Sequence, residues 1–256
     1  MDRHAGGGSL EAGAVSEIAV LFDLGGTLVD YYEWTEWPAV YAECIERAVS
    51  FLKTRSIPAL DDAEVVRRMD SIREEERQRL RVRGDWRVWP IEERMKLALF
   101  PDGSAVEAGL LQLVGREFIA PMLARARLIP GSLPALEALR NRGLPMAIVT
   151  NTPWGSPREP WVEEIHRHGL DEFTKTFVTC RDAGWRKPDR RVFALACDRL
   201  GVRAEHCWFV GDEPVWDYEG AAAAGMKPVL LDRKGQHAGK GLTVIRQLGE
   251  LVGLLE

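Results

Sequence analysis

Between Pro130 and Leu231 the chain alternates between short apolar runs and longer segments with helical periodicity. The apolar runs are β-rich and each one stops at a polar loop; they cover Pro145–Val149, Thr176–Thr179, Cys207–Val210 and Pro228–Leu231. The segments that suit helices are Leu133–Asn141, Trp161–His168, Arg190–Leu200 and Tyr218–Ala224. This alternation is typical of an α/β fold with a doubly wound, Rossmann-like parallel sheet, which carries its chemistry at the carboxyl ends of the strands.

One further strand stands apart from the others. The run Ile18–Phe22 reads as a buried strand that feeds a sharp loop at Asp23 and a Gly-Gly pair. Residues 31–127 are then charged and helix-periodic, and the helices expected there are Glu36–Thr54, a helix capped by Asp61 and Asp62, Ile91–Leu99 and Ala105–Ala124. We therefore predict a flexible tail at residues 1–17, a core made of 18–30 and 128–256, and an inserted helical cap at 31–127.

Composition excludes several classes of protein. The net charge of −5 argues against constitutive binding of nucleic acid, which requires a strongly basic face. No run approaches 18 apolar residues, so we expect no membrane span. The four cysteines show no metal-binding or disulfide spacing, which favours a reduced, cytoplasmic setting. We expect a monomer or a homodimer.

Four polar clusters follow four of the predicted strands. They are Asp23-Leu-Gly-Gly-Thr27, Thr150-Asn151, Lys187 in Arg-Lys-Pro-Asp, and the segment from Gly211-Asp212 to Asp217. Each cluster alone has a structural explanation, as a turn, a helix cap or a solvated lysine. Their joint order and spacing resemble the four motifs of the haloacid dehalogenase superfamily, most of whose members are magnesium-dependent phosphatases. The segment 31–127 lies where that family carries its helical cap.

The resemblance implies a role for each of these residues. Asp23 would be a carboxylate nucleophile that forms an acyl phosphate, and a carboxylate and a carbonyl are hard oxygen donors that suit Mg²⁺. The metal ligands would be Asp23, the backbone carbonyl of Gly25, Asp212 and Asp217. Catalysis would also use Thr150 and Lys187, and the phosphate would be bound by Gly26, Thr150, Asn151 and Lys187. The substrate would be a small anionic, phosphorylated metabolite.

The chain departs from the family at Gly25, where phosphatases usually carry a second aspartate that protonates the leaving oxygen. Such a group is worth roughly 10²–10⁴ in rate. The substrate could have a good leaving group, turnover could be slow, or another acid could substitute. The nearby candidates for a substitute are Asp30, Tyr31, Tyr32, Glu33 and Glu213. Replacing Gly25 by Asp is expected to raise the turnover of aryl and alkyl phosphates.

Two alternatives to a phosphatase stay open. A metal-independent 2-haloacid dehalogenase needs no acid for its halide leaving group, although an unfilled Asp212/Asp217 pair would repel a carboxylate substrate. A catalytically weak protein that binds phosphorylated ligands is the other. The insert contains four tryptophans, Trp34, Trp37, Trp86 and Trp89. We expect them to pack in the core of the insert; the alternative is that they bind a planar or anionic substrate.

Overall fold

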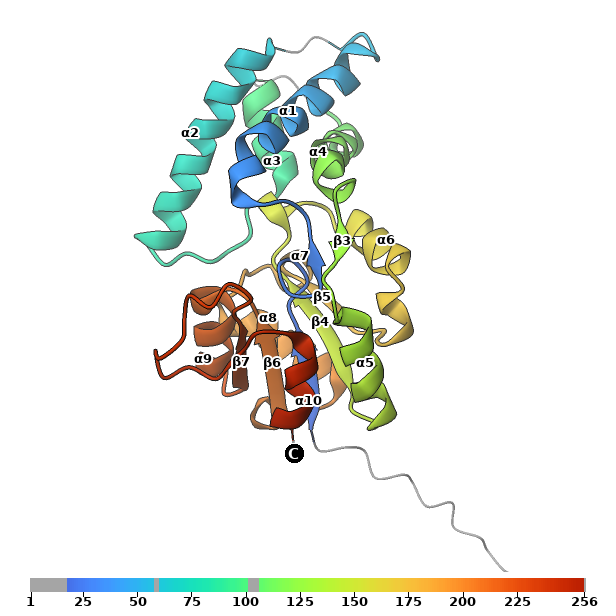
Figure 1. Cartoon of the computed structure of the whole chain (residues 1–256). Helices are drawn as coiled ribbons and strands as arrows, with labels where there is room; N and C mark the ends of the chain where they lie inside the picture. The colour runs from blue at the N-terminus through green and yellow to red at the C-terminus, as the bar shows by residue number, and fades with distance from the viewer. Residues whose placement is uncertain (1–17, 58–59, 101–105, 256) are drawn as a thin grey trace, which may run out of the picture.

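Six parallel strands form one sheet in the computed structural model, which describes residues 18–57, 60–100 and 106–255. The tail predicted at residues 1–17 lies outside this part of the chain. The strand order is β5-β4-β1-β6-β7-β8 (Figure 1). The strands are β1 (Ala19–Phe22), β4 (Met146–Thr150), β5 (Phe177–Thr179), β6 (Cys207–Gly211), β7 (Lys227–Leu231) and β8 (Val244–Ile245). The predicted parallel α/β fold is confirmed.

Both faces of the sheet are covered by helices, which explains why its central strands are apolar throughout. In β1, Val20 and Phe22 pack into one apolar cluster, and Ala19 and Leu21 pack into the other. One cluster includes side chains of α5 (Ser132–Asn141), α6 (Glu159–Arg167) and α10 (Leu251–Leu254). The opposite cluster includes side chains of α8 (Arg190–Leu200) and α9 (Gly220–Ala223).

The segment between the first and second core strands is helical, as predicted. Its helices are α1 (Trp37–Lys53), α2 (Asp62–Arg81), α3 (Ile91–Leu99) and α4 (Ala108–Leu123). Asp61 caps α2 by accepting a hydrogen bond from the backbone N–H of Glu64 at 2.9 Å. A short antiparallel pair, β2 (Val29–Asp30) with β3 (Arg127–Leu128), joins these helices to the sheet (Figure 1).

The segment after β6 differs from its prediction. In place of one α-helix over Tyr218–Ala224, the chain forms a π-helix, η5 (Pro214–Glu219), followed by the short α9. Within η5 the carboxylate of Asp217 accepts a hydrogen bond from the backbone N–H of Glu213 at 3.1 Å. This bond turns Asp217 inward, where it is buried.

The remaining elements are short. They are η1 (Trp34–Glu36), η2 (Pro153–Gly155), η3 (Leu170–Glu172), α7 (Cys180–Ala183), η4 (Ala204–His206) and η6 (Leu248–Glu250). Among the residues that the structure describes, no helix is both long and apolar enough to cross a membrane.

Candidate active site

The loop after β1 holds Asp23 at the edge of the sheet. The backbone N–H of Asp23 donates to the carbonyl of Val210 in β6 at 2.8 Å, which ties the two strand ends together. Gly26 has a φ of +81°, and a Cβ atom there would lie 2.2 Å from Oδ2 of Asp212. Only glycine permits both this backbone conformation and this approach, so the Gly-Gly pair brings the first loop against the loop after β6.

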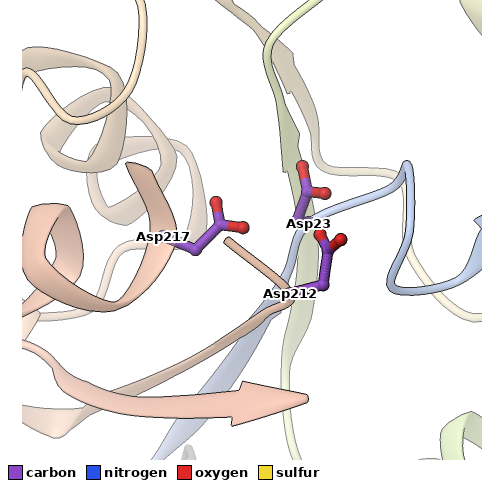
Figure 2. A group of neighbouring side chains, drawn as sticks. All are labelled: Asp23, Asp212 and Asp217. Carbon is purple, nitrogen blue, oxygen red and sulfur yellow. The ribbon is translucent and has the colours of Figure 1, made fainter. Parts of the chain in front are cut away.

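Three carboxylates meet at this edge. Asp23 follows β1, Asp212 follows β6 and Asp217 comes from η5; one oxygen from each lies within 4.8 Å of the other two. Figure 2 shows the three side chains converging from these separate segments. The parallel sheet therefore unites residues that stand far apart in the sequence, as its topology predicts.

Lys187 lies beside two of these carboxylates. Its Nζ atom is 2.5 Å from Oδ1 of Asp23 and 2.6 Å from Oδ1 of Asp217. Asn151 fixes the backbone at this point, because its side chain accepts from the N–H of Lys187 at 2.8 Å and donates to the carbonyl of Lys187 at 3.1 Å. Thr150 is buried at the end of β4, directly before Asn151.

Burial and mutual repulsion perturb these groups. Burial raises the pKa of Asp23 to about 6, with Lys187 opposing the rise and Asp217 adding to it. Burial, reinforced by Asp23 and Asp217, holds the pKa of Asp212 well above its ordinary value. Burial alone would lower the pKa of Lys187, but the charges of Asp217 and Asp23 outweigh it and raise the pKa, so the ammonium stays protonated.

The cluster is suited to a divalent cation. Among the described residues, Lys187 pairs with Asp23 and Asp217 but not with Asp212, so the three carboxylates outnumber their one ammonium neighbour. Their oxygens are hard donors close enough together to act on one ion, and such donors suit Mg²⁺ better than a soft metal. Gly25, the fourth predicted ligand, lies in the wall of the same cavity.

Tyr31 occupies the space beside Gly25. A Cβ atom on Gly25 would lie 3.3 Å from Cε2 of the Tyr31 ring, and the ring packs edge-on against Trp161 with centroids 5.6 Å apart. The Tyr31 hydroxyl is buried without a hydrogen-bond partner among the described residues. Burial and the nearby charge of Asp23 raise its pKa, so the phenol stays protonated.

A cavity of about 470 Å³ opens above the carboxylates. Its wall includes Gly25, Gly26 and Asn151, together with all five residues suggested as substitute acids. It also includes Arg233, Lys234 and His237, from a loop after β7 that carries no sequence signal for a site. Of the four tryptophans of the insert, Trp34 lies in this wall, whereas Trp37 packs on Tyr41 and Trp154, and Trp86 packs on Trp216.

The aspartate cluster, its lysine and the inserted helices define a class of hydrolase. The family model for haloacid dehalogenase-like hydrolases matches residues 19–225, so the chain belongs to that family. Phosphatase MT3486 from Mycobacterium tuberculosis is 32% identical over 134 residues, which is 52% of this chain and 58% of that protein. (S)-2-haloacid dehalogenase 4A from Burkholderia cepacia is 31% identical over 106 residues, or 41% of this chain and 44% of that protein.

The matches to these curated relatives span about half of their length. A solved structure of a HAD phosphatase from Thermococcus onnurineus aligns over 93% of this chain and 97% of its own. That alignment has a TM-score of 0.62 and 25% identity. Membership of the family therefore covers most of the chain. The relatives that match in sequence include both a phosphatase and a dehalogenase, so the matches alone do not distinguish the two activities.

Proposed function

We propose that this protein is a magnesium-dependent phosphatase that acts on small phosphate monoesters through an aspartyl-phosphate at Asp23. The observation that carries the proposal is the cluster of Asp23, Asp212 and Asp217 beside Lys187 at the floor of a cavity. Such a floor combines a nucleophile with the means to offset the negative charge of a phosphate.

The chemistry begins at the carboxylate of Asp23. Its oxygen attacks the phosphorus atom, and the bond from phosphorus to the leaving oxygen breaks as the new bond forms. The ammonium of Lys187 stabilises charge on the phosphoryl group, and Thr150 and Asn151 bind its oxygens. The backbone N–H of Gly26 is not among these donors, because it donates to the carbonyl of Val29 at 2.9 Å. Water then attacks phosphorus, which releases inorganic phosphate and restores the carboxylate of Asp23.

Asp23, Asp212, Asp217 and the carbonyl of Gly25 would hold Mg²⁺. When bound, the ion neutralises excess carboxylate charge and polarises the phosphoryl group. In a metal-independent dehalogenase this negative charge would stay uncompensated. A carboxylate substrate would then have to bind beside three aspartates that repel it. The site therefore supports phosphoryl transfer over dehalogenation.

The leaving group is expected to depart with little help from Asp30, Glu33 or Tyr31. Asp30 is bound by Arg233 at 2.9 and 2.6 Å, and Glu33 is bound by Lys234 at 3.0 Å. Tyr31, with its raised pKa, is a hydrogen-bond donor rather than a proton source. Substrates with good leaving groups, such as acyl and aryl phosphates, are therefore expected to react fastest.

Phosphate release from a panel of acetyl phosphate, phenyl phosphate and alkyl phosphates tests the proposal. We expect release that requires Mg²⁺, stops with EDTA and falls at least 10³-fold in Asp23→Asn, the order of loss seen when a nucleophile is removed. Release that survives this substitution would contradict the role of Asp23. Release of chloride from 2-chloropropionate in the presence of EDTA, with no phosphate from the panel, would establish the dehalogenase instead.

A further inference from the structure

One part of the cavity wall is aromatic. Its aromatic and thioether side chains are Tyr31, Tyr32, Trp34, Trp161, Trp216 and Met122. Tyr31 meets Trp161 edge to face, and Tyr32 meets Trp34 in the same way with ring centroids 6.5 Å apart. Aromatic side chains prefer to pack against other rings and apolar faces. The place that a leaving group would occupy therefore favours a ring over a small polar group.

Trp34 is the most exposed aromatic residue of this wall. Its side chain is 73% exposed, although it touches the rings of Tyr32 and Trp37. Exposure of so large an apolar surface gains nothing for folding, because the hydrophobic contribution comes from removing area from water. A ligand that covers Trp34 would recover that contribution.

The cations of the wall are already committed to carboxylates. Arg233 makes a two-point ion pair with Asp30, at 2.9 and 2.6 Å, and Lys234 binds Glu33 at 3.0 Å. Both pairs start from the loop after β7; one reaches the end of β2 and the other reaches the segment that follows it. A second anionic group on a substrate would have to break one of them to gain a partner.

The other polar groups of the wall offer an anion little. Nδ1 of His237 contacts Nζ of Lys240 at 3.3 Å, so this ring nitrogen already has a partner. Glu213 adds an exposed carboxylate to the same wall. A second anion there would face a like charge, which disfavours its approach.

We infer that the site selects phosphate monoesters whose leaving group is uncharged and carries a ring, either aromatic or a sugar. The inference rests on the proposed phosphatase activity and adds the chemistry of the substrate to it. The aromatic wall binds one face of the ring, while the paired cations and Glu213 disfavour a second negative charge.

Two matched substrate pairs test this selectivity with the full-length protein and saturating Mg²⁺. The aromatic pair is phenyl phosphate against 4-carboxyphenyl phosphate, and the sugar pair is glucose 1-phosphate against glucuronic acid 1-phosphate. We expect kcat/KM to favour the uncharged member of a pair by about tenfold or more, a difference that unpaired polar groups readily produce. The carboxylate makes the phenol a better leaving group, so chemical reactivity alone predicts the opposite order. The ring whose KM is lower is the preferred one, because kcat also depends on the acidity of the leaving group.

Substitution of Trp34 tests the wall itself. Trp34→Ala is expected to raise KM for the preferred ring substrate by about three- to tenfold, the value of one aromatic contact. Trp34→Phe should restore most of this loss. KM for acetyl phosphate, which has no ring, is measured alongside, and the increase should be larger for the ring substrate than for acetyl phosphate. Because Trp34 is largely exposed, both variants are expected to fold, which a thermal melt confirms.

The outcomes separate the two claims. Equal kcat/KM within both pairs, a preference for the charged members, or no effect of Trp34→Ala on any ring substrate would overturn the selectivity while the phosphatase stands. A charged preference that Arg233→Ala removes would assign the wall to anion binding instead. Absence of any Asp23-dependent phosphate release would overturn the proposed function, and the selectivity would fall with it.

Discussion

Gly25 and Tyr31 share one small volume beside the nucleophile. The Tyr31 ring lies 3.3 Å from the place where a side chain on Gly25 would begin. Contacts this short require a neighbour to move, and Trp161 holds the ring from another side. An aspartate at position 25 would therefore require the Tyr31 ring to shift, which the sequence does not reveal because Tyr31 is six residues further on.

This contact changes the expected result of adding an aspartate. Gly25→Asp alone is expected to lower the melting temperature and to gain less than about tenfold in kcat on benzyl phosphate. Gly25→Asp combined with Tyr31→Ala provides the space, and its kcat should exceed that of Tyr31→Ala by roughly 10². Steady-state kinetics on the four proteins measures both steps.

The comparison has a clear negative result. If Gly25→Asp alone raises kcat as much as the double variant does, the Tyr31 ring does not limit the position. Tyr31→Phe is the matched control for the hydroxyl. It removes a buried group that has no hydrogen-bond partner among the described residues, so it should not lower stability.

Asp212 gives the second test at the level of a single residue. Its folded-state pKa is raised by burial, so in the metal-free protein the protonated form is the favoured one. The stability that this protonation supplies is present at about pH 4 and is lost as the pH rises through the folded pKa. For Asp23, burial raises the pKa from 3.8 to about 6. This rise corresponds to a loss of roughly 3 kcal/mol in the free energy of unfolding of the metal-free protein at neutral pH, compared with low pH.

Asp212→Asn is therefore expected to stabilise the metal-free protein at about pH 8 and to have little effect at about pH 4. Thermal melts across this range, in EDTA, measure the difference. Mg²⁺ should raise the melting temperature of the wild type at about pH 8 and that of the variant much less. Asp198→Asn removes an exposed carboxylate of α8 and should show no such trend. A pH-independent effect of Asp212→Asn would contradict this account.

Among the elements, the inserted helices contact the core next to the site. The segment after α2 pairs with the segment before Lys187, through N–H of Arg186 to the carbonyl of Trp86 at 2.9 Å and N–H of Val88 to the carbonyl of Gly184 at 3.0 Å. Glu76 of α2 reinforces this contact, because it pairs with Arg94 of α3 and with Arg186 of the core. The insert is thus fixed to the residue that precedes Lys187.

Glu76→Gln tests this contact. The Arg94 side chain is fully buried and that of Arg186 is 10% exposed, so the substitution leaves two buried guanidinium groups without their carboxylate. We expect a loss of about 3 kcal/mol in the free energy of unfolding, measured with urea. Glu74→Gln is the matched control on the same helix, since its ion pair with Arg77 is half-exposed and should contribute less than about 1 kcal/mol. Equal losses in the two variants would contradict the role of Glu76.

Elements with a strong local pattern were predictable from the sequence. The ranges Ile91–Leu99 and Arg190–Leu200 agree with the structure, because periodic apolar residues and clear breakers mark their ends. The pair β2 and β3 was not predicted, since each strand has two residues and depends on a partner about 100 positions away. The π-helix at Pro214–Glu219 was missed because periodicity does not reveal its backbone bond, which runs from the N–H of Tyr218 to the carbonyl of Glu213 at 3.3 Å.

At the scale of the whole molecule, the sheet topology made the centre of the site predictable. Asp23, Lys187, Asp212 and Asp217 follow or flank strand ends, and parallel strands bring those ends to one edge. The outer wall was not predictable in the same way. Arg233 and Lys234 form ion pairs with Asp30 and Glu33, which lie about 200 residues away in the sequence. No local pattern encodes such a pairing.

Detection of a covalent phosphate on Asp23 is the most direct test of the phosphatase account. Without a side chain at Gly25 to activate water, breakdown of the acyl phosphate should be slow and the intermediate should accumulate. Acid quenching during turnover of acetyl phosphate, followed by borohydride reduction, would convert a phosphorylated Asp23 into homoserine, which peptide mass spectrometry detects. We predict homoserine at position 23 with Mg²⁺ and its absence with EDTA. Steady release of phosphate while Asp23 stays unmodified would contradict the account.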